Sequence, residues 1–170
     1  MSHNPVRSVD HIALAVRSIA DASVLFRDVF GGSFVTGGDD EKLQLRSIQY
    51  TLPPGIKIEL LQPLSAESQL AGFLDKHGEG FHHVTLFFDD IEGLIPDLSA
   101  AGFEVTDTDL QDEGWRETYL RPRSGFGALF QLVDTTKNWS VPHPDVSEED
   151  VIAGRVRWDG TTPVLKEKSR

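Results

Sequence analysis

The chain has 170 residues, of which 27 are acidic and 16 basic, so its formal net charge is −11, and it contains no cysteine. The missing thiols exclude a disulfide framework, a cysteine nucleophile and a thiolate metal site. The acidic balance argues against a large nucleic-acid footprint, which needs clustered Lys and Arg. No apolar run approaches the roughly 20 residues that cross a bilayer, and residues 1–5 lack the layout of a signal peptide. We therefore expect a cytoplasmic protein with neither a nucleic-acid nor a membrane partner.

Strand-like and helix-like patterns follow one another twice in the same order. The first set predicts strands near 9–16, 33–36, 43–51 and 56–61 and a helix near 19–30. The second set predicts strands near 80–87, 103–106, 115–121 and 128–133 and a helix near 90–101. Between the sets we expect a connecting helix that Ser65 caps and Gly78 ends. Beyond Asp134 the pattern gives way to a turn-rich tail with a capping box at Ser147.

The two sets are copies of one unit. At an offset of 72 residues, the strand-like segment Asp10–Val16 matches His82–Phe88, and Ile56–Leu61 matches Ala128–Val133. Each copy reads strand, helix and three strands. The sequence therefore predicts an α+β fold built from two tandem βαβββ modules.

These modules set the expected domain organisation. The modules span 7–64 and 79–135, and a linker helix over 65–78 joins them into one domain, residues 1–135. The tail over 136–170 carries no copy of the repeat, and we expect it to pack on this domain or on a partner subunit.

Four polar side chains stand at matching positions of the two copies. Residues i and i+2 of a strand share a face, so His11 and Glu59 point away from the apolar face of their strands. His83 and Gln131 do the same in the second copy, and the separation is 48 residues in both copies. The apolar faces, expected to pack on helices, are Ile12, Leu14, Val16, Ile58, Leu60, Val84, Leu86, Phe88, Phe130 and Leu132.

If the copies pack about a pseudo-twofold axis, these four side chains converge on one point. Two imidazoles, one carboxylate and one amide oxygen suit a divalent ion such as Mn, Co, Ni, Fe or Zn, with two positions left for water or substrate. A single histidine on a strand is more often a hydrogen-bonded structural residue, so the prediction depends on the repeat.

Several segments resemble one enzyme family. The residues that carry the resemblance are Val9–Ala13, Ile58–Leu64, Ser68–Val84, Phe88–Glu92, Arg121-Pro122 and Gly127–Phe130. They resemble methylmalonyl-CoA epimerases, which belong to the vicinal oxygen chelate (glyoxalase/bleomycin resistance/dioxygenase) superfamily, and the resemblance spans roughly residues 7–134.

The resemblance implies a cupped, barrel-like mixed sheet with helices outside and a homodimer. It implies metal ligands at His11, Glu59, His83 and Gln131, and proton transfer beside the carbonyl of an acyl-CoA or a related small molecule.

Gln131 departs from the family pattern, which usually has a glutamate there. An amide oxygen can bind a metal but cannot act as a general base near neutral pH. We therefore expect Glu59, at the equivalent position of the other copy, to move the proton. Two alternatives stay open: a glyoxalase- or dioxygenase-type metalloenzyme that uses two histidines and one carboxylate, and a small-molecule-binding protein without turnover.

Arginines are few in this acidic chain, so each could hold an anion. Arg46 and Arg116 are the ones we expect to contact a CoA phosphate or a substrate carboxylate, because a guanidinium binds planar anions through two hydrogen bonds. The commoner role of such residues is pairing with nearby carboxylates.

Overall fold

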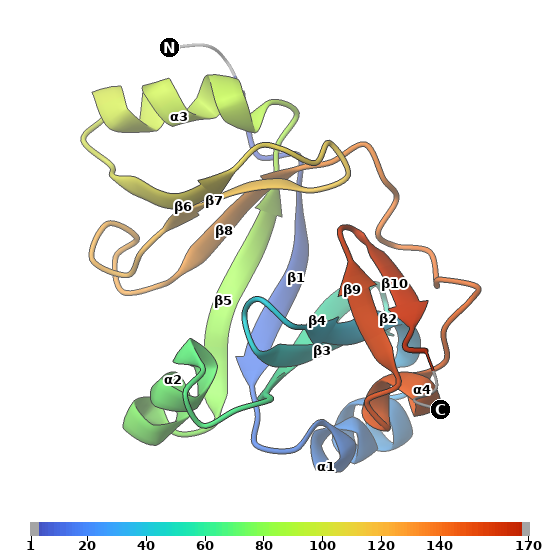
Figure 1. Ribbon diagram of the computed structural model, residues 1–170. Coiled ribbons are helices and arrows are strands. Elements are labelled where there is room, and N and C mark those ends of the chain that lie inside the picture. The colour runs from blue at the N-terminus through green and yellow to red at the C-terminus, as the bar shows by residue number, and fades with distance from the viewer. Residues whose placement is uncertain (1–3, 168–170) are drawn as a thin grey trace. The chain divides into compact units, whose positions relative to one another are not determined.

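Figure 1 shows the computed structural model, which describes residues 4–167. The chain separates into two compact units. Unit 1 holds residues 4–12 with His82–Asn138, and unit 2 holds Ala13–Phe81 with residues 139–167. Strand β1 (Ser8–Ala15) begins in unit 1 and ends in unit 2.

Unit 1 is a mixed sheet with one helix. Its elements are β5 (Gly80–Phe87), of which the first two residues belong to unit 2, α3 (Ile91–Ala100), β6 (Val105–Asp109), β7 (Arg116–Leu120) and β8 (Phe130–Asp134). Strand β5 runs parallel to β8, which is antiparallel to β7, which is antiparallel to β6. Ile91 and Leu94 of α3 pack on Leu132 of β8 in one buried cluster. The apolar face predicted for β8 is therefore covered by a helix.

Unit 2 contains an antiparallel meander and most of the helices. Its elements are α1 (Ile19–Ser23), the π-helix η1 (Val24–Val29), β2 (Ser33–Asp40), β3 (Leu45–Leu52), β4 (Ile56–Pro63), α2 (Gln69–His77), α4 (Glu148–Ile152), β9 (Val156–Asp159) and β10 (Thr162–Leu165). Strands β2, β3 and β4 pair in sequence order, and the β9–β10 hairpin joins the free edge of β2 in parallel. None of the described helices is both long and apolar enough to cross a bilayer.

The duplication predicted from the sequence is present in the elements. The starts of β1 and β5, of α1 and α3, and of β2 and β6 are each 72 residues apart. Strands β1 and β5 also have the same residue-by-residue burial, with every second position buried toward their ends. The α+β class and the βαβββ order are therefore confirmed.

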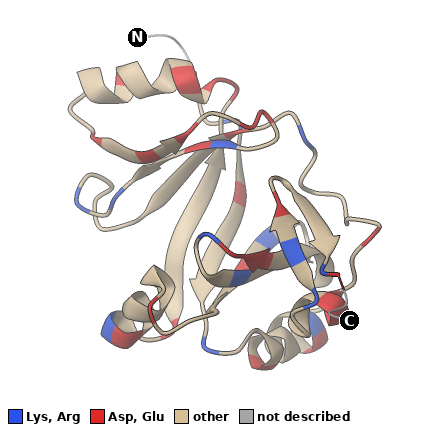
Figure 2. Cartoon of the chain, viewed as in Figure 1, with Lys and Arg blue, Asp and Glu red and all other residues tan. Residues whose placement is uncertain are grey.

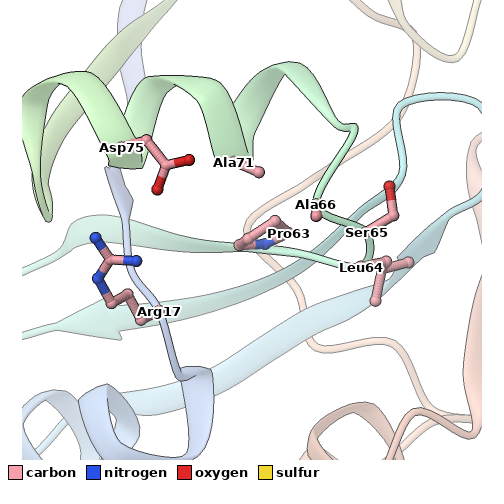
Figure 3. Close-up of a pocket in the computed structure, with 7 residues that line it drawn as sticks. All are labelled: Arg17, Pro63, Leu64, Ser65, Ala66, Ala71 and Asp75. Carbon is pink, nitrogen blue, oxygen red and sulfur yellow. The ribbon is translucent and has the colours of Figure 1, made fainter.

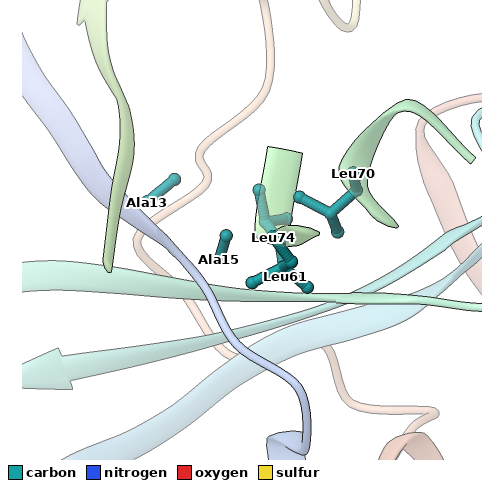
Figure 4. Close-up of a cluster of buried hydrophobic side chains, with 5 residues drawn as sticks. All are labelled: Ala13, Ala15, Leu61, Leu70 and Leu74. Carbon is teal, nitrogen blue, oxygen red and sulfur yellow. The ribbon is translucent and has the colours of Figure 1, made fainter. Parts of the chain in front are cut away.

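One face of β1 is covered differently from the prediction. Ala13 and Ala15 share their face with His11, and we expected that face to point away from the helices. They pack instead against Leu70 and Leu74 of α2 in a buried cluster with Leu61 (Figure 4). Helix α2 belongs to neither copy of the repeat, so the repeat could not show which face it covers.

Two helix predictions are also corrected in detail. The expected helix near 19–30 is a five-residue α-helix followed by the π-helix η1. The linker helix is capped by Ser68 rather than Ser65, since the Ser68 hydroxyl accepts from the Ala71 N–H at 3.1 Å. Ser65 instead supplies a carbonyl to the Ser68 hydroxyl.

Residues 139–167 of the tail belong to unit 2. Ser147 caps α4 by accepting from the Asp150 N–H, as its capping box predicts. The sequence prediction missed the β9–β10 hairpin, although Gly160 opens its two-residue turn between two β-prone segments, a position where glycine is typical. These strands lengthen the sheet of unit 2 beyond β2.

Candidate metal centre

His11 is held in unit 1 by a buried carboxylate. Only 2% of its surface is exposed, and its Nδ1 lies 2.7 Å from Asp10 Oδ2, a side chain that is also buried. Its Nε2 lies 2.9 Å from Thr85 Oγ1 of β5. The carboxylate at Nδ1 fixes the ring and leaves Nε2 facing the interior. A metal-binding histidine usually has such a carboxylate at the ring nitrogen that does not bind the metal.

His83 lies beside His11 in the same unit. The two ring centroids are 5.5 Å apart at an interplanar angle of 70°. His83 is buried, as strand alternation predicts, while its neighbour His82 is half-buried and places its Nδ1 2.9 Å from His83 Nδ1. The structure thus brings His83, not His82, to the same face as Thr85 on β5.

Gln131 of β8 completes a polar network in unit 1. Its Oε1 accepts from the Thr85 hydroxyl at 2.5 Å. Its Nε2 donates to Glu117 Oε2 at 2.6 Å and to the Tyr119 hydroxyl at 2.9 Å, both on β7. Sequence reasoning did not include Thr85, Glu117 or Tyr119 among the metal ligands or substrate contacts. The signals in the sequence were the two-residue spacing of Thr85 from His83 and of Glu117 from Tyr119. The register of β7 against β8, which brings the last two residues to Gln131, was unknown.

Glu59 lies in unit 2, in the centre of β4. It is 9% exposed, and its Oε1 accepts from Gln49 Nε2 at 2.9 Å across the β3–β4 pair. Gln49 Oε1 is buried and has no hydrogen-bond partner within residues 4–167. A carboxylate and an amide oxygen therefore sit side by side in a buried part of this unit.

The residues present fit a divalent metal ion by the chemistry of their donors. In unit 1, His11 and His83 offer imidazole nitrogens and Gln131 an amide oxygen, and in unit 2 Glu59 offers a carboxylate oxygen. This mixed nitrogen and oxygen set suits Mn, Co, Ni, Fe or Zn. The buried carboxylate on His11 Nδ1 is the observation of this structure that most favours a metal ligand over a plain structural histidine.

The two arginines expected to bind substrate are held by carboxylates. Arg46 makes two hydrogen bonds to Asp39, at 2.6 and 3.1 Å, and a third to the Ile152 carbonyl. Arg116 makes two bonds of 2.7 Å to Asp134, and these raise the pKa of its guanidinium. Each side chain therefore has a structural role within its own unit, and substrate contact by either stays a prediction.

Charge elsewhere is mixed in sign. Lys and Arg are interspersed with Asp and Glu on strands and loops of both units, whereas α3 carries acidic residues alone (Figure 2). Exposed pairs such as Arg123 with Glu104 contribute little to stability.

A surface hollow lies in unit 2, beside α2 (Figure 3). Its lining residues are Arg17, Pro63, Leu64, Ser65, Ala66, Ala71 and Asp75. None of the side chains predicted to bind metal or substrate lines it, so the hollow adds nothing to the candidate centre.

Comparison with known proteins gives a consistent set of relatives. A family model described as the Glyoxalase/Bleomycin resistance protein/Dioxygenase superfamily matches residues 10–119. An ethylmalonyl-CoA/methylmalonyl-CoA epimerase of Cereibacter sphaeroides is 31% identical over 128 residues, which cover 73% of this chain and 95% of the relative.

Two solved structures share the fold. Methylmalonyl-CoA epimerase from Mycobacterium tuberculosis has a TM-score of 0.72 at 24% identity, covering 81% of this chain and 93% of that one. A Streptomyces coelicolor methylmalonyl-CoA epimerase variant, in complex with 2-nitronate-propionyl-CoA, has a TM-score of 0.69 at 24% identity, covering 78% and 100%.

Proposed function

Because the chain belongs to the Glyoxalase/Bleomycin resistance protein/Dioxygenase superfamily, we propose that it is a metal-dependent epimerase or isomerase. It moves a proton on the carbon beside a carbonyl group, and its substrate is an acyl-CoA thioester. The observation that carries the proposal is the buried histidine pair, His11 and His83, at equivalent positions of the two repeats. The epimerase relative gives the substrate class.

The proposed metal ligands come from both copies of the repeat. His11 and His83 supply imidazole nitrogens, Gln131 supplies its amide oxygen, and Glu59 supplies a carboxylate oxygen. Bound there, a divalent ion would polarise the substrate carbonyl and stabilise the negative charge that develops when the proton leaves.

Strand geometry supports the proposal that Glu59 belongs to this set. It shares a face of β4 with Leu61, and Leu61 packs with Ala13 of β1. His11 precedes Ala13 by two residues in the same strand and therefore shares its face. Glu59 and His11 are thus assigned to matching faces of their strands.

Glu59 is also the proposed catalytic residue. A general base must be a group that can accept a proton, which a carboxylate can do and the amide of Gln131 cannot. Gln49 holds Glu59 Oε1 and so limits the directions that the carboxylate can face. Glu59 would take the proton from one face of the substrate carbon, and inversion requires that a proton return to the opposite face.

Other features of the proposed enzyme follow from its relatives and its composition. A CoA thioester carries phosphates, and Arg46 and Arg116 stay the arginines predicted to meet them. The homodimer and the cytoplasmic location also stay predictions.

The test is deuterium exchange at C2 of methylmalonyl-CoA in D₂O, measured by mass spectrometry on protein stripped of metal and on protein reloaded with Co²⁺ or Mn²⁺. We expect exchange that requires the metal and that falls at least about 100-fold in Glu59→Gln, the usual contribution of a general base. Glu67→Gln, at an exposed glutamate of the same unit, is the matched control. Full exchange in Glu59→Gln would remove that residue's role, and a metal-loaded protein without exchange would refute the function.

A further inference from the structure

The side-chain amide of Gln131 can be oriented in two ways. One way directs Oε1 toward Thr85 and Nε2 toward Glu117, and the other exchanges the two atoms. Only the first orientation puts an oxygen on the side of Thr85, whose hydroxyl is also 2.9 Å from His11 Nε2. The choice matters because a neutral amide binds a metal ion through oxygen, while its NH₂ group is a donor only.

Glu117 decides between the two orientations. A carboxylate accepts hydrogen bonds and donates none, so only an N–H can face it. Glu117 Oε2 lies 2.6 Å from Gln131 Nε2, and exchanging the amide atoms would place two oxygens at that distance. The tyrosine hydroxyl of Tyr119 cannot decide the matter alone, because it can donate or accept.

Glu117 itself is held firmly on β7. Its Oε2 also accepts from Trp115 Nε1 at 2.7 Å and from the Tyr119 hydroxyl at 3.1 Å. Three donors on one oxygen fix the position of the carboxylate. Charge-assisted bonds of this kind are about twice as strong as neutral ones.

We infer that Glu117 is a positioning residue that turns the Gln131 amide oxygen toward Thr85 and His11. Gln131 can then bind a metal ion through its amide oxygen, while Glu117 holds the amide nitrogen on the opposite side. The orientation is a property of the metal-free protein, and its consequence for metal binding rests on the proposed function.

The pair also explains why the glutamate usual in related epimerases cannot simply replace Gln131 here. A glutamate at position 131 would set two carboxylate groups 2.6 Å apart in place of an N–H donor and its acceptor. Gln131 and Glu117 therefore depend on one another, and exchanging both residue types should be tolerated better than changing Gln131 alone.

The orientation is tested in ¹⁵N-labelled, metal-free protein by NMR. We expect nuclear Overhauser contacts from the Gln131 side-chain NH₂ protons to the Tyr119 ring and none to the Thr85 methyl group. Contacts to the Thr85 methyl group in the unmodified protein would overturn the inference. This measurement needs no metal, so its outcome is separate from that of the proposed function.

The consequence is tested by titration with Co²⁺, followed by its visible absorption bands and by calorimetry. We expect Glu117→Ala to bind Co²⁺ at least about 10-fold more weakly, the usual effect of losing an outer partner of a ligand. Glu117→Gln should bind nearly normally, because its amide oxygen can still accept from Gln131 Nε2. Glu104→Gln, at an exposed glutamate of the same unit, is the control.

A double substitution completes the test. We expect Gln131→Glu to bind Co²⁺ about 10-fold more weakly than the double variant Gln131→Glu/Glu117→Gln, which has one carboxylate at the pair instead of two. Equal affinity of these two proteins, or normal affinity of Glu117→Ala, would overturn the role of Glu117 in metal binding. Thermal unfolding and NMR spectra of each variant identify any that fail to fold.

Discussion

Tyr50 gives the most quantitative prediction about stability. Its ring is fully buried in unit 2, and its hydroxyl lies 2.7 Å from Glu148 Oε1 of α4 and 2.8 Å from Ser23 Oγ of α1. Arg27 also donates to Glu148, at 2.7 Å. Tyr50→Phe removes only the hydroxyl, and we expect it to lower the free energy of unfolding at pH 7 by about 1 to 3 kcal/mol, because buried partners lose a hydrogen bond.

The same side chain predicts how stability depends on pH. Burial raises the pKa of Tyr50 above its ordinary value of 10.0, and the hydrogen bond to Glu148 raises the pKa further. The protonated phenol therefore stabilises the fold below pH 10, and this contribution is lost as pH rises toward the pKa of the folded state. Between pH 9 and pH 11 the loss is about 1.4 kcal/mol, since the unfolded tyrosine ionises and the folded one does not.

Urea denaturation at pH 7, 9, 10 and 11 measures both effects. The difference in unfolding free energy between the unmodified protein and Tyr50→Phe should shrink by about 1.4 kcal/mol from pH 9 to pH 11. Glu148→Gln should retain most of this alkaline loss, because burial is the largest cause of the raised pKa. Parallel stability curves for the unmodified protein and Tyr50→Phe would refute the reasoning.

Three further predictions concern single side chains. Gly72→Ala should raise the unfolding free energy by about 1 kcal/mol, because the position is exposed on α2 and the space around the added Cβ is open. Gly37→Ala should lower the unfolding free energy, because its Cβ would lie 2.5 Å from a backbone oxygen of β3. Chemical denaturation compares the two variants. Arg46→Ala should lower the unfolding free energy by about 3 kcal/mol, because the buried carboxylate of Asp39 loses its arginine and keeps Lys166 as a partner. A variant of normal stability in which the KM alone changes would instead favour contact of Arg46 with the substrate. Asp10→Asn should weaken Co²⁺ binding about 10-fold or more, as measured by calorimetry, since it removes the carboxylate that holds His11 Nδ1. Unchanged Co²⁺ affinity would argue against His11 as a metal ligand.

The sequence predicted what depends on local periodicity and on the duplication. Strands β1 and β5 were expected near 9–16 and 80–87, and they span Ser8–Ala15 and Gly80–Phe87. Alternation chose His83 over His82 for the buried face, and the structure buries His83. The family resemblance is confirmed by the superfamily model and by the epimerase relatives.

Contacts between strands could not be read in the same way. The partner of Arg46 is Asp39, which lies directly opposite it in the β2–β3 register. The partner of Gln131 is Glu117, which depends on the register of β7 against β8. Register is set by side-chain packing across the sheet and by the loops, so it is invisible to a pattern along one strand.

The claim on which the function depends is that His11, Glu59, His83 and Gln131 bind one metal ion together. Crystals of the Co²⁺-loaded protein, measured at the cobalt absorption edge, test it directly. We predict a single strong anomalous peak bonded to two imidazole nitrogens, the Glu59 carboxylate and the Gln131 amide oxygen. A cobalt ion bound elsewhere, or bound to the two histidines without Glu59, would contradict the account.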